Sequence, residues 1–153
     1  RRIALSSTGV HWVRPGEAES RRALSQVGHT RGFAALVDEW LPPMVAPANR
    51  DKADLYNGMR QMCLDNGQAM FDAQITAQIN RPVQDVLLEQ IACPALVMTG
   101  ELDAWAPPAQ HAAIADRIAN SELVIVPGAG HMLPAEAPDA VNAAIARWLA
   151  MPA

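Results

Sequence analysis

The stretch PALVMTGELD, residues 94–103, decides the fold of this chain. Its first seven residues run almost without a polar side chain from a proline to a glycine, which is typical of a parallel strand covered on both faces. Pro94 is tolerated at the first position of such a strand. We therefore predict a buried strand at 94–100 whose carboxyl end leads into a loop with two carboxylates, Glu101 and Asp103.

A helix and a second strand follow. Pro107 and Pro108 can begin a helix, because proline at the first helical position loses no intrahelical hydrogen bond, and the pattern extends this helix to about Ala119. Residues 123–126, LVIV, form a second apolar run that predicts a buried strand, and a last helix begins near Pro138. This order of strand, helix, strand and helix predicts a parallel βαβ unit of an α/β fold.

The segment before this unit has a different pattern. Residues 3–5 predict a short strand, whereas residues 10–82 predict helices at 17–27, 32–40, 52–64 and 69–79. In the third helix Leu55, Met59 and Met62 recur at spacings of four and three, which predicts one apolar face. We therefore expect a strand within 1–9, a helical block within 10–82 and a C-terminal α/β unit at 83–153.

Composition limits the partners of the protein. Twelve basic and sixteen acidic residues give a formal charge of −4 with no long run of like charge, which argues against a nucleic-acid partner. No apolar stretch reaches the length of a membrane span, so no membrane partner is expected. Cys63 and Cys93 are isolated, which indicates neither a disulfide nor a metal site and favours a cytoplasmic location.

Two side chains in this unit carry candidate chemistry. Asp103 follows the first strand, and His131 follows the second, 28 positions later, at the end of the stretch PGAGH. The glycines of this stretch permit the positive φ angles of a tight turn. Carboxyl ends of neighbouring parallel strands meet at one edge of a sheet, so a right-handed crossover should bring the two together. A carboxylate on one imidazole nitrogen leaves the other free to take a proton from a nucleophile.

Structural alternatives exist for each candidate. Asp103 could cap the turn before the helix, and His131 could be a loop histidine held by backbone groups. Glu101 is a weaker candidate for the acid, and Trp105 either lines a pocket or packs over the helix start. For the remaining residues the interpretation is structural. We expect a polar turn at Ser6, Ser7 and Thr8, a solvated helix face at His111, and no assigned role for His11 and His29. The Arg81-Pro82 pair is interpreted as the junction between the helical segment and the core, or simply as a helix terminator.

The segments CPALVMTGELD (93–103) and PGAGHM (127–132), with EAP (136–138) and a closing Trp148-Leu149, resemble the C-terminal half of the α/β-hydrolase superfamily. The resemblance implies that Asp103 is the acid and His131 the base of a nucleophile-acid-histidine triad. It also implies a core strand at 1–9, a helical cap over the pocket at 10–82 and a C-terminal core at 83–153, with no metal or organic cofactor. Trp105 is a further candidate for contact with substrate.

The sequence departs from this family in one respect. No G-x-S-x-G nucleophile motif occurs in it, and no glycine-rich oxyanion loop. The chain opens on Arg1 inside a strand-like run, so we expect a missing N-terminal half to supply both and the present chain alone to be inactive. The intact protein is then expected to hydrolyse an ester, a lactone or a related small acyl substrate. The alternative is a non-catalytic module that binds a small ligand or a partner chain.

Overall fold

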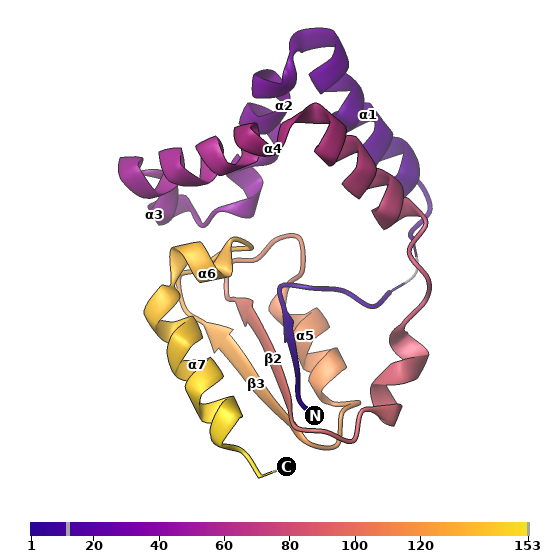
Figure 1. The fold of residues 1–153 in the computed structure, drawn as a ribbon, viewed down its shortest axis with the longest axis vertical. Coiled ribbons are helices and arrows are strands. Elements are labelled where there is room, and N and C mark those ends of the chain that lie inside the picture. Colours follow the sequence, from indigo (N-terminus) through magenta and orange to yellow (C-terminus); the bar gives the residue numbers. More distant parts are fainter. Residues whose placement is uncertain (12, 153) are drawn as a thin grey trace.

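The computed structural model describes residues 1–11 and 13–152. Within them, the sheet is parallel with strand order β1-β2-β3, formed by β1 (Ile3–Ser6), β2 (Ala95–Gly100) and β3 (Ser121–Val126). Helix α5 (Pro108–Ala115) packs on one face of the sheet and α7 (Pro138–Ala150) on the other. The carboxyl ends of the strands point toward a separate layer of helices (Figure 1). The predicted parallel α/β arrangement is therefore confirmed.

Strand β2 is central, and all six of its residues are buried. Its side chains alternate between two clusters, as the period of two in a strand requires. Leu96 and Met98 pack toward α7, while Ala95 and Val97 pack toward α5. A strand covered on both faces in this way has to be apolar throughout, which explains the uninterrupted run in the sequence.

Only one face of strand β3 packs against the core, although its sequence predicts a strand buried on both faces. Val124 and Val126 pack in the cluster under α7. Leu123 and Ile125 point the other way and are 39% and 42% exposed, so the prediction of a fully buried run is wrong for them. The reason is the position of β3 at the edge of the sheet, where the cluster under α5 includes residues of β2 and not these two.

The helical layer is formed by residues between β1 and β2. Its members are α1 (Glu17–Arg31), α2 (Phe33–Trp40), a 3-10 turn (Pro42–Met44), α3 (Pro47–Arg50) and α4 (Ala53–Ile79). The predicted helices at 52–64 and 69–79 are one element, α4, which is kinked at Gly67 with φ of 73°. The layer has its own core, built around buried side chains that include Leu36, Val37, Leu41, Met59 and Phe71.

The prediction of an apolar face on α4 is confirmed at Met59 and wrong at Met62. Met59 is buried, but Met62 is 50% exposed and lines a small pocket with Trp40 and Met132. Cys63, one turn after Met59, takes the buried position instead, because residues four apart share a helix face. The thiol of Cys63 and that of Cys93 are both free.

Several elements differ in extent from the prediction. Helix α5 ends at Ala115 and not near Ala119, and the sequence did not indicate α6 (Leu133–Glu136) or the 3-10 helix at Asp85–Gln90. Among the described residues, no helix is both long enough and apolar enough to cross a bilayer.

The end of β2 lies in direct contact with the loop after β3, and this contact depends on Gly100. A Cβ atom built on Gly100 would lie 2.2 Å from the carbonyl oxygen of Ala129 and 2.4 Å from that of Gly130. Both obstacles are backbone atoms, which cannot move aside as a side chain can. The hydrogen bond from the backbone N–H of Leu102 to Ala129 O, 2.9 Å long, fixes the same approach.

We therefore expect Gly100→Ala to lower the free energy of unfolding by about 3 kcal/mol, because the added methyl group overpacks this contact. Urea unfolding followed by circular dichroism measures the change. The matched control is Gly58→Ala in α4, where a Cβ meets nothing within 4 Å and should stabilise the helix by about 0.5–1 kcal/mol. Equal stability of the two variants would contradict the close approach.

Candidate functional site

The carboxylate of Asp103 lies in the loop after β2, and the residue is only 2% exposed. Its Oδ1 accepts the backbone N–H groups of Trp105 at 2.9 Å and Ala106 at 2.8 Å. The hydroxyl of Thr99 lies 3.2 Å from Oδ2. Asp103 therefore has the turn-capping role that the sequence left open, and this role leaves Oδ2 for a further donor.

That donor is His131, which follows β3. Its Nδ1 donates to Asp103 Oδ2 at 2.9 Å and lies 3.1 Å from Oδ1. The contact predicted between these two residues is therefore present. Because a carboxylate can only accept, the proton of the neutral imidazole sits on Nδ1, and Nε2 is the nitrogen that can take a proton.

The protonation of Asp103 follows from opposing influences. Burial raises the pKa of this carboxyl group, because the charged form loses its water. The hydrogen bond from His131 and those from the backbone of Ala106 and Trp105 lower it, and the balance leaves the pKa below its ordinary value. Asp103 is therefore ionised at neutral pH, so it can stabilise a protonated imidazole on His131.

The loop that carries His131 also touches the helical layer. Gly128 has a φ of 66°, which the sequence allowed for a glycine in a tight turn, whereas Gly130 has no positive φ. Gly130 is needed for space, since a Cβ there would lie 2.8 Å from both Ala46 N and Met44 O. The backbone N–H of His131 donates to Met44 O at 2.8 Å. The helical layer thus holds the backbone of His131 directly.

A second connection between the same segments is made by Glu136 in α6. Its Oε2 accepts the backbone N–H of Ala46 at 2.8 Å and the side-chain amide of Asn49 at 2.9 Å. Its Oε1 accepts the N–H of Met132, 3.1 Å away, beside His131. Asn49 itself is 5% exposed. Glu136 therefore clamps the turn of the helical layer to the histidine loop.

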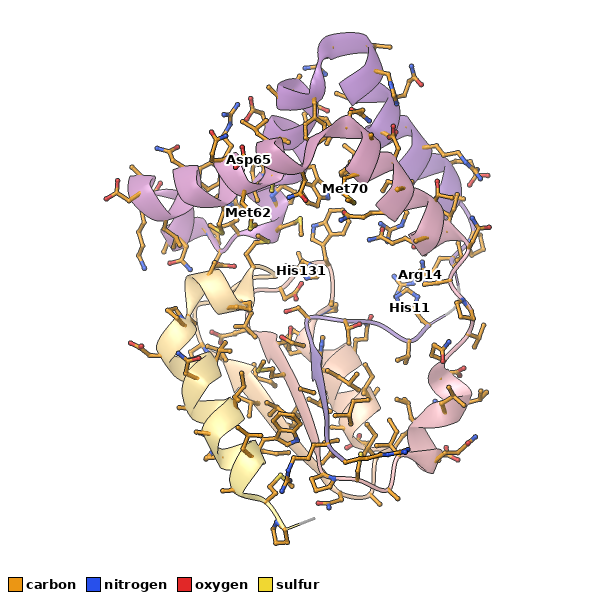
Figure 2. All side chains as sticks on the ribbon, viewed as in Figure 1. His11, Arg14, Met62, Asp65, Met70 and His131 are labelled. Atoms are coloured by element: carbon orange, nitrogen blue, oxygen red, sulfur yellow. The ribbon has the colours of Figure 1, made fainter. Side chains whose placement is uncertain are left out.

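A cavity of about 620 Å³ lies between the helical layer and the ends of the strands. His131 and Trp105 line it from below, and the Trp105 ring centroid is 6.4 Å from that of His131. Both His131 and His11 line the cavity, and Figure 2 shows His131 beneath the helical layer and His11 to its right. Of the two roles that the sequence left open for Trp105, lining a pocket is the one observed. The layer contributes an apolar wall of Leu24, Trp40, Met44, Phe71 and Ile75.

The expectation of a solvated face at His111 is wrong, because this residue is 0% exposed. Its Nε2 accepts the backbone N–H of Thr8 at 3.1 Å, and its Nδ1 donates to Pro107 O at 3.3 Å. Burial lowers the pKa of His111, which keeps the ring neutral. The ring ties the turn after β1 to the start of α5, and Gln110 adds a bond from Nε2 to Thr8 O at 2.8 Å.

The weaker candidates lie elsewhere. Glu101 is exposed and accepts the N–H of Gly128, so it does not approach His131 as an acid would. Ser7 directly follows β1 and has a φ of 44°, and its hydroxyl and that of Ser6 have no hydrogen-bond partner among the described residues. His29 is exposed and pairs with Asp72. Within 1–11 and 13–152, no group of three metal-binding side chains is arranged to hold an ion.

Some residues at this site were missed in the sequence. Thr99 was the only polar side chain in a buried strand, and that position could have indicated a partner for Asp103. Glu136 belongs to the EAP segment, but nothing in the sequence indicated its contact with Ala46. Arg21 and Arg81 also line the cavity, although Arg81 was interpreted only as part of a junction or a helix terminator.

Comparisons with known proteins point to one family. The model of the family described as TAP-like protein matches residues 56–153. An esterase from Thermogutta terrifontis, solved with malate bound, is 30% identical, with a TM-score of 0.89 over 97% of this chain and 55% of its own. The enol-lactonase from Burkholderia xenovorans is 25% identical, with a TM-score of 0.84 over 99% of this chain and 56% of its own.

A hydrolase from Pseudomonas aeruginosa, 23% identical over 99% of this chain and 56% of its own, shares the fold with a TM-score of 0.83. The chain thus spans just over half the length of these structures. A comparison with curated proteins gives no significant match.

The buried, neutral state of His111 predicts a pH dependence of stability. An unfolded histidine takes up a proton below about pH 6.5, whereas the lowered pKa of His111 delays protonation in the folded state. The unfolded state therefore binds more protons in this window, and stability should fall as the pH drops from 7 to about 5. His111→Gln should flatten this fall, as measured by urea unfolding at each pH.

The matched control for His111→Gln is Gln110→Ala, which removes the neighbouring bond to Thr8 without removing a titrating group. It should lower stability at every pH by about 1 kcal/mol and leave the slope unchanged. If the two variants show the same slope as the parent, the buried neutral state of His111 is wrong.

For the clamp, we expect Glu136→Ala to lower the free energy of unfolding by about 3 kcal/mol, because it leaves the donors of Ala46, Asn49 and Met132 without an acceptor. The amide proton of His131 should also exchange faster with deuterium, since its acceptor Met44 is then less firmly held. Glu19→Ala, at an exposed position of α1, should change stability by no more than about 1 kcal/mol. Similar values for both variants would rule out the clamp.

Proposed function

Since the chain belongs to the TAP-like family of the α/β-hydrolase superfamily, we propose that it carries the acid and the base of a hydrolase acting on esters, lactones or related small acyl compounds. The observation that carries this proposal is the bond of 2.9 Å from His131 Nδ1 to Asp103 Oδ2, beside a cavity of about 620 Å³. Asp103 acts as the acid and His131 as the base of a nucleophile-acid-histidine triad.

The nucleophile and the oxyanion donors come from outside these 153 residues, since the sequence holds no G-x-S-x-G motif. The nucleophile is a serine hydroxyl, which gives its proton to Nε2 of His131 as its oxygen bonds to the acyl carbon. The ionised Asp103 stabilises the resulting imidazolium. His131 then returns the proton to the departing alkoxide, and an ester of the enzyme remains.

Water completes the cycle by the same route. It gives a proton to Nε2 as its oxygen attacks the ester of the enzyme, and the serine recovers that proton when the acid product leaves. No step requires a metal ion or an organic cofactor. The helical layer, residues 10–82, acts as the cap that shields the reacting atoms from bulk water.

The proposed substrate class has two supports. An esterase and an enol-lactonase are among the proteins that this chain resembles. The cavity has the size of a small-molecule site and combines an apolar wall with a few polar groups, as ligand sites usually do.

A second candidate is a non-catalytic module that binds a small ligand. The cavity would serve such a module equally well, and these 153 residues contain no recognisable nucleophile. This function would leave the Asp103–His131 bond without a purpose.

Reading the coding DNA upstream of Arg1 and expressing the complete protein decides between the two. A complete hydrolase should turn over p-nitrophenyl butyrate, and a fluorophosphonate should label its nucleophile. The 153-residue chain alone should do neither. His131→Ala in the complete protein should lower kcat by roughly 10³-fold or more, because the base is lost.

The matched control is His29→Ala, at an exposed position of α1 away from the cavity lining, which should leave kcat within about twofold. A complete protein that binds small esters without turnover or labelling would favour the binding module.

A further inference from the structure

Next to its apolar wall, the cavity has a polar wall where α1 begins and α4 ends. Its members are His11, Glu17, Arg21, Gln78 and Arg81. His11 lies across the cavity from His131, so a ligand whose reacting group meets His131 can extend its other end toward this wall (Figure 2).

Two guanidinium groups in this wall share one carboxylate. Arg81 binds Glu17 with both terminal nitrogens, Nη1 to Oε1 at 2.7 Å and Nη2 to Oε2 at 2.9 Å. Arg21, one helical turn after Glu17 in α1, donates its Nε to Oε1 at 2.9 Å. The three side chains are only 14% to 23% exposed, so this cluster is largely shielded from water.

The cluster is not neutral. Among the described residues that line the cavity, the ionised groups of fixed charge are Glu17, Arg21 and Arg81, which leaves a surplus of one positive charge. The hydrogen bonds from Arg81 and Arg21 lower the pKa of Glu17 far below its ordinary value despite its burial. Glu17 is therefore ionised, and its negative charge is included in this sum. A half-buried, uncompensated guanidinium attracts an anion more strongly than one in open water.

Arg21 has the donor for such an anion. Its Nε is used by Glu17 and its Nη1 by the side-chain oxygen of Gln78, but its Nη2 has no hydrogen-bond partner among the described residues. Arg81 differs, because Nη1 also donates to Gln78 O and Nε to His11 O. Arg81 thus supplies charge and holds the segments together, while Arg21 can also donate to a ligand.

We propose that this polar wall binds a carboxylate at the far end of the substrate, so that the protein prefers acyl compounds with one negative charge, such as half-esters or lactones of dicarboxylic acids. This inference rests on the proposed hydrolase function. A monoanion matches the single surplus charge, whereas a phosphate dianion exceeds it. The apolar wall contacts the carbon chain between the two ends.

Binding to the 153-residue chain itself tests the preference without any need for turnover. Monomethyl adipate and dimethyl adipate are titrated into the chain, and the fluorescence of the tryptophans, two of which line the cavity, reports binding. The half-ester should bind at least about tenfold more tightly than the diester, since charge-assisted hydrogen bonds contribute about 1.5–3 kcal/mol.

Variants of α1 separate charge from structure. Arg21→Gln should remove the preference for the half-ester, while Arg22→Gln, its exposed neighbour outside the cavity lining, should keep it. Glu17→Gln breaks the same cluster but raises the surplus to two positive charges, so it should strengthen binding of the half-ester. Two variants that disrupt one cluster with opposite effects cannot be explained by misfolding.

Equal binding of half-ester and diester, no saturable binding of the half-ester at millimolar concentration, or weakening by both Arg21→Gln and Glu17→Gln would overturn the proposal. None of these results bears on whether the complete protein hydrolyses neutral esters. Conversely, a preference for the half-ester in a protein that never turns over esters would leave the anion site standing and refute the hydrolase function.

Discussion

An ionised carboxylate that is 2% exposed costs several kcal/mol unless donors surround it, and at Asp103 the backbone supplies two of them. The loop after β2 therefore has to turn sharply enough to aim the N–H groups of Trp105 and Ala106 at one oxygen. The other oxygen then faces the loop after β3. The position of His131 is a consequence of this requirement, because its Nδ1–H completes the set of donors.

The helical layer takes part in the same arrangement. The backbone of His131 is held by Met44 O, and Glu136 ties the neighbouring turn of the layer to the histidine loop. Both contacts require a residue without a side chain at position 130, because a Cβ atom there would meet Met44 O and Ala46 N. The ring of His131 is thus held by Asp103 in the loop after β2, and the backbone of His131 is held by the helical layer. Such double support favours precise placement of a base, since each contact alone would leave the ring free to rotate or the loop free to shift.

The sequence predicted what short-range patterns encode. The apolar run of β2, the glycines before His131 and the spacing of two loops across a βαβ unit were sufficient to predict that Asp103 and His131 meet. The pattern within one segment could not reveal which of its faces packs against another element. Leu123 therefore looked buried and His111 looked solvated, although burial at both positions is decided by the placement of α5 relative to the sheet. The same holds for Glu136, whose acceptor role requires a backbone N–H that lies 90 positions away.

Two carboxylates stabilise the surroundings of the cavity, Glu136 between the helical layer and the histidine loop and Glu17 within the layer, and their donors differ in kind. Glu136, near α3 and α6, is held partly by backbone N–H groups, which move only with their whole segment (Figure 1). Glu17 joins the start of α1 to the segment after α4, and its donors are largely guanidinium groups on flexible side chains. Arg21 and Arg81 can follow Glu17 by rotating side-chain bonds, whereas the backbone amides around Glu136 cannot adjust in this way. The contact beside His131 is therefore the stiffer of the two, which favours a fixed position for the base next to a polar wall whose side chains can adjust to a ligand.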